Sequence, residues 1–330
     1  MTDDLAHPNE RTETFDVLTM GRMGVDLYPL EPDVALEDVT TFGRFLGGTA
    51  ANVAVAAARH GRRSGVISRT GADPFGRFIH RALRELGVDD RFVTPVPDLP
   101  TPITFCEMRP PDSFPLWFYR WPKAPDTEIR AEELDDAAIR SARVLWTTLS
   151  GLSQEPSRSA QLHAWRVRER SPLTIFDLDY RPTFWSSPDD ATRQARAALE
   201  WVDSAVGNLE EAFVATGEHD GLRAARALLE RGVHLAVIKR GPGGVLAVTE
   251  DEVVDVPPFE VEVVNGLGAG DGFGGALCHG LLAGWPLERV MRFANAAGAL
   301  VASRVECSTA MPTTAEVEEA IMGGTHRATV

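Results

Sequence analysis

Strand-like and helix-like segments alternate through the middle of the chain, and this alternation restricts the fold more than any other feature. Four short apolar runs are typical of strands, at 144–148, 173–178, 204–207 and 235–239. Between and after them lie helix-like stretches at 154–170, 188–202 and 219–231. Such alternation predicts parallel strands in one sheet with helices on both faces. We therefore expect a doubly wound, mostly parallel α/β fold.

Composition limits the classes of partner. The chain has 330 residues, with 33 Lys and Arg against 48 Asp and Glu, a net charge of −15 and a pI near 5.0. This balance argues against binding to nucleic acid or to an anionic membrane surface. The three cysteines are widely spaced, the N-terminus lacks signal-peptide character, and no apolar run approaches the ~20 residues that cross a bilayer. These features predict a cytoplasmic protein.

The chain is expected to form a single domain over 15–330, preceded by a flexible polar tail at 1–14. Nine prolines fall between residues 93 and 125, around two extended runs at 103–108 and 116–121. Proline-broken extended runs indicate a few antiparallel strands outside the main sheet. We expect 26–46 and 99–125 to form this small β lid. Its aromatic residues around Arg120 and Lys123 fit either a solvated edge strand or a cover over a substrate.

A glycine-rich turn at 265–272 joins a β-branched run to an apolar, helix-like segment. A strand, a glycine turn and a helix start would form an anion site, because backbone N–H groups and the helix dipole converge there. Asp271, at the mouth of the helix, suits a base that deprotonates a hydroxyl attacking a phosphoryl group. On the turn alone, an ordinary helix cap explains Asp271 equally well.

Polar residues at the predicted strand ends are further candidates, because ligands of such sheets bind beyond the carboxyl ends of the strands. Asn208 and Glu211 lie three residues apart at a helix start, and fit either a water-bound Mg²⁺ or a capping arrangement. Asn52 follows a glycine pair in the first turn of an alanine-rich helix. Its amide would reach a ligand or make a local hydrogen bond. The remaining candidates at strand ends are Asp177, Asp179, Arg181 and Lys239.

The first predicted strand, 15–20, is followed by Gly-x-x-Gly rather than the Gly-x-Gly-x-x-Gly of dinucleotide-binding domains. The next residues include Pro29 and Pro32 and cannot form the helix that such a domain requires. These two departures argue against a nicotinamide-dependent enzyme.

Four motifs occur in order along nearly the whole chain, from about residue 15 to 322. They are Gly47-Gly48 with Asn52, Asn208-x-x-Glu211, Lys239-x-Gly241 and Gly268-Ala269-Gly270-Asp271. Together they resemble the ribokinase-like (PfkB) carbohydrate kinases. The family usually has aspartate and threonine shortly before its Gly-Ala-Gly-Asp, where this chain has Asn265 and Gly266. Residues 177–185 (DLDYRPTFW) and 310–313 (AMPT) are similar to the 5-dehydro-2-deoxygluconokinases of myo-inositol catabolism.

The resemblance implies ATP-dependent phosphorylation of the primary hydroxyl of a sugar acid, 5-dehydro-2-deoxy-D-gluconate in the first instance. Its alternatives are a 2-dehydro-3-deoxygluconate kinase and a neutral-sugar kinase of the fructokinase or ribokinase type. Asp271 would be the general base, assisted by the backbone of Gly268, Ala269 and Gly270. The residues implied to bind the sugar are Asp26, Gly47, Gly48, Asn52, Arg120 and Arg181.

Two arginines, Arg120 and Arg181, would clamp the carboxylate with their forked donors. Arg181 would otherwise be a structural ion-pair partner of Asp177 or Asp179. The resemblance also implies Mg²⁺ held through water at Glu211, a monovalent cation such as K⁺, and a homodimer formed through the lid. The residues implied to bind ATP are Asn208, Lys239, Gly241, Gly243, Gly266 and Asn295.

Overall fold

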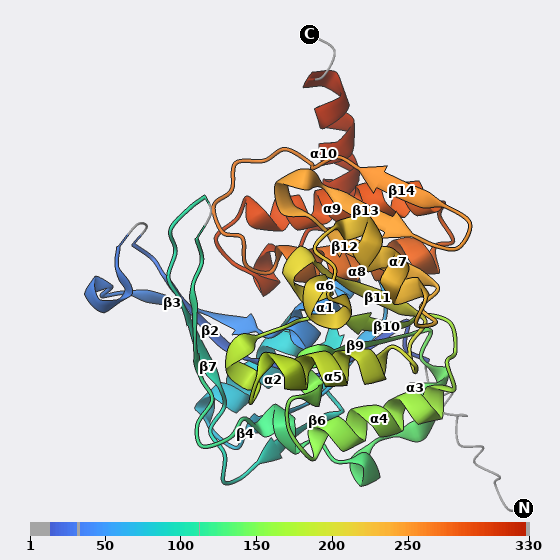
Figure 1. Ribbon diagram of the computed structural model, residues 1–330. Helices are drawn as coiled ribbons and strands as arrows, with labels where there is room; N and C mark the ends of the chain where they lie inside the picture. The colour runs from blue at the N-terminus through green and yellow to red at the C-terminus, as the bar shows by residue number, and fades with distance from the viewer. Residues whose placement is uncertain (1–13, 32–33, 112, 328–330) are drawn as a thin grey trace, which may run out of the picture.

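The computed structural model describes residues 14–31, 34–111 and 113–327 (Figure 1). All but the last residue of the expected N-terminal tail lies outside this part of the chain. The helices in the described part of the chain lack the length and apolarity needed to cross a bilayer.

The described residues form a ten-stranded main sheet, and its order confirms the doubly wound fold. Neighbouring strands are parallel except in the hairpin at one edge, where β12, β13 and β14 are antiparallel. In spatial order the strands are β14 (Val253–Val256), β13 (Val245–Val248), β12 (Leu235–Lys239), β11 (Ser204–Asn208), β10 (Thr174–Asp177), β9 (Val144–Thr148), β1 (Val17–Met20), β4 (Ser64–Gly71) and β5 (Val88–Asp89), with β6 (Val93–Val96) also paired to β4.

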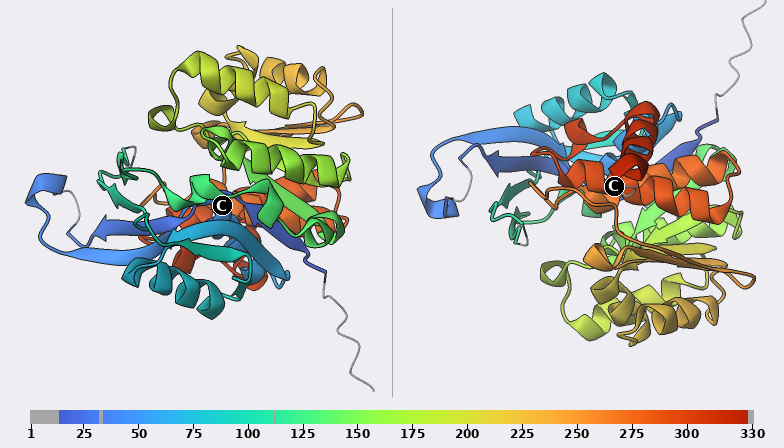
Figure 2. Two further views of the ribbon diagram at one scale, coloured as in Figure 1. Left: turned by 90° about the horizontal axis from the view of Figure 1, so that it is seen from below. Right: turned by 90° about the horizontal axis from the view of Figure 1, so that it is seen from above.

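Helices cover both faces of this sheet (Figure 2). Helices α1, α8 and α9 pack on one face, and α4, α5 and α7 pack on the other. Successive strand residues therefore alternate between two apolar cores, as Ile175 and Phe176 do in β10. The helices are α1 (Thr49–Arg59), α2 (Pro74–Glu85), α3 (Asp136–Ser141), α4 (Ser157–Arg168), α5 (Pro188–Ala198), α6 (Leu209–Thr216), α7 (Gly221–Leu229), α8 (Ala269–Leu282), α9 (Leu287–Ala302) and α10 (Thr314–Arg327).

A second, smaller sheet lies beside the main body, at the left of Figure 1. It consists of β3 (Phe42–Gly47), β2 (Gly24–Pro29), β7 (Ile103–Cys106) and β8 (Leu116–Tyr119), in that order. The β2–β3 and β7–β8 pairs are antiparallel, as expected, but β2 and β7 are parallel. More than 70 residues, including α1 and α2, separate β2 from β7, so the chain can return in the same direction.

Glycines in α8 let this helix pack unusually close to its neighbours. A Cβ atom on Gly275 would lie 2.3 Å from Ala56 in α1, and one on Gly274 would lie 2.8 Å from Trp146 in β9. No real Cβ contact is that short, so larger residues would push α8 away from the sheet. This close packing fixes the start of α8 at the carboxyl end of the main sheet.

The prediction of a strand at 261–264, before the glycine turn, is wrong, because the backbone of this stretch is irregular. The backbone N–H groups of Val264 and Asn265 donate hydrogen bonds of 2.9 and 3.0 Å to the carbonyl of Ala302. The segment is thus tied to the last residue of α9 instead of to a neighbouring strand. The turn still leads directly into α8, so the expected turn–helix junction is present.

Candidate active site

The glycine turn places Asp271 in the first turn of α8. Gly268 occupies the N-cap position with a φ of 77°, and a Cβ atom there would lie 2.6 Å from the sulfur of Cys307. Both the backbone conformation and the contact require glycine. Because Gly268 is the N-cap and no side chain caps α8, Asp271 is not the ordinary cap that the sequence left open.

The Asp271 carboxylate is held by a side-chain amide from another helix, far away in the sequence. Asn52, in the first turn of α1, donates a 2.8 Å hydrogen bond from Nδ2 to Oδ2 of Asp271. Burial raises the pKa of Asp271 to about 6, in spite of the opposing Asn52 hydrogen bond and the charges of Arg22 and Lys239. A carboxylate that titrates this close to neutrality is suited to general-base chemistry.

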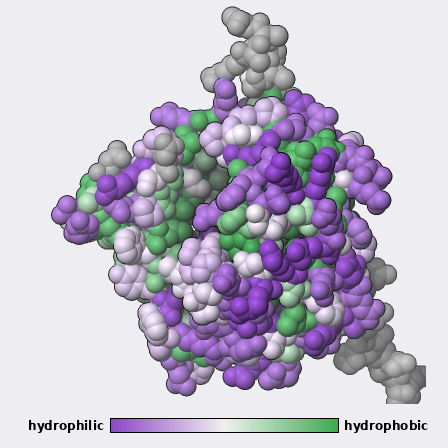
Figure 3. Space-filling model, viewed as in Figure 1, coloured by the Kyte–Doolittle hydropathy of each residue, from purple (hydrophilic) through white to green (hydrophobic). Residues whose placement is uncertain are grey.

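Asp271 lines a cavity of about 50 Å³ between the small sheet and the main body. Six residues predicted from the sequence meet there: Asp26, Gly48, Asn52, Arg181, Gly268 and Asp271. The cavity also contains residues that sequence reasoning missed, among them Arg22, Tyr28, Thr104, Phe118 and Cys307. Figure 3 shows apolar surface gathered where the small sheet meets the larger body.

Asp26 is positioned by its neighbours in the small sheet. The Tyr28 hydroxyl donates a 3.0 Å hydrogen bond to Oδ2 of Asp26 and lies 2.8 Å from the sulfur of Cys307. A Cβ atom on Gly47, in the neighbouring strand β3, would lie only 2.1 Å from the Asp26 carboxylate. Burial raises the pKa of Asp26, and the nearby positive charge of Arg22 opposes this.

The two arginines expected to clamp a carboxylate lie in different places. Arg181 lines the cavity, but its Nη2 lies 2.9 Å from Asp179 Oδ1 and its Nη1 lies 3.7 Å from Glu211 Oε1. The structural ion pair with Asp179 is therefore present. Arg120 is not among the residues lining the Asp271 cavity.

Arg120 instead faces an adjacent pocket, and its guanidinium lies 4.7 Å from the centre of the Phe184 ring. Its Nη2 lies 2.8 Å from Asp126 Oδ2, and both side chains are largely buried, at 14% and 7% exposure.

Lys239 lies against the other side of the glycine turn. It ends β12 beside Asn208 of β11, and its Nζ would be 3.1 Å from a Cβ atom on Gly270. Burial opposes its charge, yet Asp177, Glu211 and Asp271 together raise the pKa of Lys239. Lys239 is therefore a cation at neutral pH, next to backbone amides at a helix start, which is a phosphate-binding arrangement.

The other residues predicted to bind the nucleotide lie in three separate segments of the chain. Gly241 and Gly243 form a single turn of 3₁₀ helix after β12, and Gly266 packs near the Phe114 ring. Asn295, in α9, donates a 2.8 Å hydrogen bond from Nδ2 to the carbonyl of Pro257. The structure does not bring these residues into the Asp271 cavity.

Asn208 and Glu211 form the capping arrangement that the sequence left open. The Glu211 N–H donates to Asn208 Oδ1 at 2.9 Å, and the Asn208 N–H donates to Glu211 Oε2 at 2.8 Å. Among the described residues, no group of three or more His, Cys, Asp and Glu side chains could hold a metal ion. The donors present therefore suit Mg²⁺ only when it is bound mainly through water and phosphate oxygens, its usual mode in kinases.

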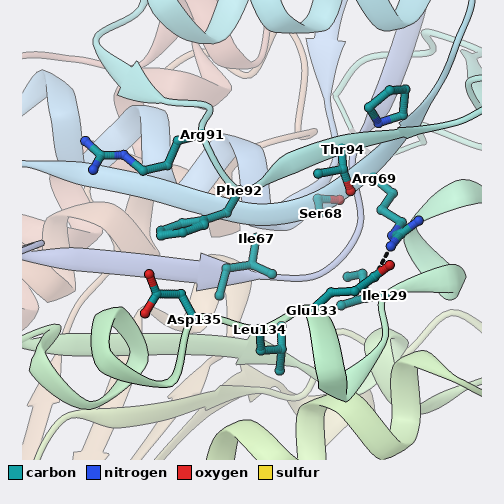
Figure 4. A pocket seen from close by; sticks show the side chains of 11 residues that line it. Ile67, Ser68, Arg69, Arg91, Phe92, Thr94, Ile129, Glu133, Leu134 and Asp135 are labelled. Carbon is teal, nitrogen blue, oxygen red and sulfur yellow. Dashed lines mark hydrogen bonds and ion pairs between the residues drawn. The ribbon is translucent and has the colours of Figure 1, made fainter.

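A larger cavity, of about 340 Å³, lies away from these residues (Figure 4). It lies between strands β4 and β6 and the 129–135 segment, and none of the predicted site residues lines it. Its arginine on β4, Arg69, is paired with Glu133, as the dashed line in Figure 4 shows. Its size alone does not make it the candidate active site.

The doubly wound sheet has a lysine at the end of β12, next to a glycine turn that leads into a helix. The first turn of this helix carries a carboxylate held by an amide. This arrangement is typical of a phosphotransferase that acts on an alcohol group. The family model described as pfkB family carbohydrate kinase matches residues 14–314, and the chain belongs to this family. The protein is thus a carbohydrate kinase, which uses ATP to phosphorylate a small sugar substrate.

Individual relatives agree with this assignment. The chain is 32% identical to a 5-dehydro-2-deoxygluconokinase of Geobacillus kaustophilus, covering 95% of this chain and 96% of the relative. It superposes on a PfkB protein of Polaromonas with a TM-score of 0.82 and 26% identity, covering 92% and 99% of the two chains. It also superposes on a fructokinase double mutant of Vibrio cholerae, which was solved with fructose, ADP and potassium. The TM-score is 0.81 and the identity 25%, covering 94% of this chain and 99% of the fructokinase.

Proposed function

We propose that this kinase transfers the γ-phosphoryl group of ATP to the primary hydroxyl of a sugar acid, with 5-dehydro-2-deoxy-D-gluconate as the substrate. The observation that carries the proposal is Asp271, hydrogen-bonded to Asn52 at the start of α8 inside a cavity that Asp26 and Arg181 also line. The name of the Geobacillus relative supports the substrate class.

In this proposal Asp271 takes the proton of the substrate hydroxyl. The hydroxyl oxygen then attacks the γ-phosphorus, the bond to the β–γ bridging oxygen breaks, and ADP leaves. Because Asn52 binds Oδ2, the other carboxylate oxygen, Oδ1, is available to the hydroxyl. The backbone N–H groups of residues 268–270 and the Lys239 ammonium stabilise charge on the transferred group.

The remaining sugar hydroxyls bind to Asp26, Gly48 and Asn52. Asn52 Oδ1 is buried and accepts no hydrogen bond within the described part of the chain, so it can accept one from a hydroxyl. Gly48, with a φ of 99°, leaves no space for a side chain, since a Cβ atom would lie 2.5 Å from the Arg22 carbonyl oxygen.

ATP is proposed to lie over the carboxyl ends of β11 and β12 and the start of α8. Its contacts would be Asn208, Lys239, Gly241, Gly243, Gly266 and Asn295. Mg²⁺ would be held through water near Glu211, where it supplies positive charge to the phosphates. The ADP and potassium in the Vibrio fructokinase support a nucleotide site and a monovalent cation site in this chain.

Substrate entry requires the small sheet to move. The cavity of about 50 Å³ has room for one or two water molecules, whereas a six-carbon sugar acid is several times larger. We therefore assign residues 26–46 and 99–125 to a lid within a single domain spanning 15–330. Lid closure would exclude water from the phosphoryl group and limit wasteful hydrolysis of ATP.

The outer face of the lid is the proposed dimer interface. Side chains of 116–121 alternate, so that Phe118 faces the cavity while Trp117, Tyr119 and Trp121 are 55%, 65% and 85% exposed. Three exposed aromatic residues on β8 and just after it are typical of a contact with another protein surface. Light scattering of a Trp117→Ser, Trp121→Ser variant tests this, and an unchanged mass would contradict the assignment.

The three buried, unpaired cysteines support a reducing, cytoplasmic location.

The substrate is tested by incubating the protein with ATP, Mg²⁺ and a panel of sugar acids and neutral sugars. We expect 5-dehydro-2-deoxy-D-gluconate to give the highest kcat/KM. A higher kcat/KM for 2-dehydro-3-deoxygluconate would change the substrate but keep the class. A panel in which neutral sugars exceed every sugar acid would contradict the proposal.

A further inference from the structure

Two of the three arginines at or beside the cavity already have close carboxylate partners. Arg181 pairs with Asp179 at 2.9 Å, and Arg120 pairs with Asp126 at 2.8 Å. All four side chains are largely or partly buried, so these charges interact strongly with each other. An arginine already neutralised in this way attracts a further anion weakly.

Arg22 is the arginine in the cavity without such a partner. Among the described residues Asp26, Asp179 and Asp271 are near enough to interact with its charge, but none of them forms an ion pair in contact with it. Its one hydrogen bond in this part of the chain is from Nη2 to Thr49 Oγ1, at 3.0 Å. Its Nε is buried and donates no hydrogen bond within the same part of the chain, as is also true of Arg181 Nε, so the two arginines differ in their carboxylate contacts. A buried donor without an acceptor is unfavourable, and an incoming carboxylate would remove that penalty.

The surroundings of Arg22 hold its guanidinium on the sugar side of the site. The guanidinium carbon lies 5.5 Å from the ring centre of Phe118 on the lid strand, and 5.9 Å from that of Phe184. Gly48 packs against the backbone of Arg22, because a Cβ atom there would be 2.5 Å from its carbonyl oxygen. Arg22 lines the cavity together with Asp26 and Asn52, which are proposed to bind the sugar, whereas Lys239 does not line it.

From these contacts we infer that Arg22 binds the carboxylate of the sugar acid and sets the preference for acids over neutral sugars. Its forked donors suit a carboxylate, and the lid ring of Phe118 would order the guanidinium when the lid closes. Arg181 completes the carboxylate site, and Arg120 keeps its pair with Asp126. The inference rests on the sugar-acid function proposed above.

The test compares Arg22→Met with the wild-type enzyme on a sugar acid and on its neutral counterpart, in which the carboxylate is reduced to an alcohol. We expect KM for the acid to rise by about 10²-fold, the size typical of losing one partner of a buried charge pair. The KM values for the neutral sugar and for ATP should change less than about threefold. Calorimetric titration of the acid without ATP should show the same loss of affinity.

Two further variants separate the possible causes. Arg120→Met tests the competing assignment, in which Arg120 binds the carboxylate. Because Arg120 does not line the cavity and is paired with Asp126, we expect this variant to retain the preference for the acid. Arg22→Lys keeps the charge but loses the fork, so it should recover part of the affinity and also report on folding if Arg22→Met is unstable.

Equal losses for acid and neutral sugar, no loss in Arg22→Met, or an acid-specific loss in Arg120→Met would each overturn the inference. A wild-type enzyme that prefers neutral sugars would instead refute the sugar-acid function itself. An acid-preferring wild type with an unaffected Arg22→Met refutes only the role of Arg22.

Discussion

Asn52 donates a 2.8 Å hydrogen bond to Asp271 across 219 residues of sequence. The contact joins the first turn of α1 to the first turn of α8, two helices that pack against each other on this face of the sheet. The amide orients the carboxylate and favours its ionised form, against the burial that raises its pKa to about 6. Asn52 therefore controls both the position and the proton affinity of the proposed base.

Replacing Asp271 with Asn should lower kcat by about 10²-fold or more, the size expected for loss of a general base. The side chain keeps its shape, so the affinity for ATP should stay nearly unchanged. Steady-state kinetics and nucleotide titration measure the two quantities. Near-normal turnover in Asp271→Asn would remove this residue from the mechanism.

The pH profile of kcat should fall on the acid side with an apparent pKa near 6. Asp271 must be ionised to accept a proton, and below its pKa of about 6 it is protonated. Removing the amide in Asn52→Ala takes away a hydrogen bond that lowers this pKa, so the acid limb should move toward neutral pH. An acid limb that stays in place in Asn52→Ala would show that another group titrates.

Gly47→Ala should weaken sugar binding by displacing Asp26. The new Cβ atom would lie 2.1 Å from the Asp26 carboxylate, which is buried and must shift. A misplacement of about 1 Å in a positioning group can cost about 10²-fold. We expect kcat/KM for the sugar to fall by that order while KM for ATP is little changed.

Gly323→Ala is the matched control for this glycine substitution, since a Cβ atom there would meet nothing within 4 Å. It should leave both KM values unchanged. An unaffected kcat/KM in Gly47→Ala would mean that Asp26 does not bind the sugar.

Lys239→Met should raise KM for ATP by about 10-fold or more, because it removes a cation at the phosphate-binding turn. The chain contains only two lysines, and Lys123 provides the control, since it lies in the proposed lid segment and pairs with Glu128. Lys123→Met should leave KM for ATP unchanged. Equal effects of the two substitutions would exclude a specific role for Lys239.

The sequence predicted the main sheet well because both of its faces are buried, which leaves continuous apolar runs. The run at 144–148, for example, coincides with β9. The strand expected at 261–264 had the same β-branched composition, but its N–H groups bind the carbonyl of Ala302. Ala302 lies 38 residues after Val264 in the sequence, so this hydrogen bond could not be predicted from the residues near 261–264.

The candidate site was predictable where a motif carried it, as for Asp271 and Asn52. Arg22 could have been found by the rule that ligands lie beyond strand ends, because it follows the carboxyl end of β1. Tyr28 and Cys307 approach each other across 279 residues, and only the fold brings them together. Arg120 was expected within an extended run at 116–121, but the strand ends at Tyr119 and Arg120 follows it. Its partner Asp126 could not be anticipated from residue type alone.

The stability of the folded protein should fall between neutral and mildly acidic pH through His60. This residue is the C-cap of α1 and is 5% exposed, and its Nδ1 lies 3.1 Å from the hydroxyl of Thr314. Burial lowers its pKa to about 3, with the charges of His279, Arg59 and Arg62 acting in the same direction.

In the unfolded chain His60 binds a proton near its ordinary pKa of 6.5, and in the folded protein it does so only near 3. Stability is therefore present above pH 6.5 and is lost as the pH falls toward 3, by roughly 2 kcal/mol between pH 7 and 5. In His60→Gln, the difference between the free energies of unfolding at pH 7 and pH 5, measured by chemical unfolding, should be smaller by about this amount. His219→Gln, at an exposed histidine, is the control that should keep it. An unchanged slope in His60→Gln would show that His60 is protonated in the folded protein.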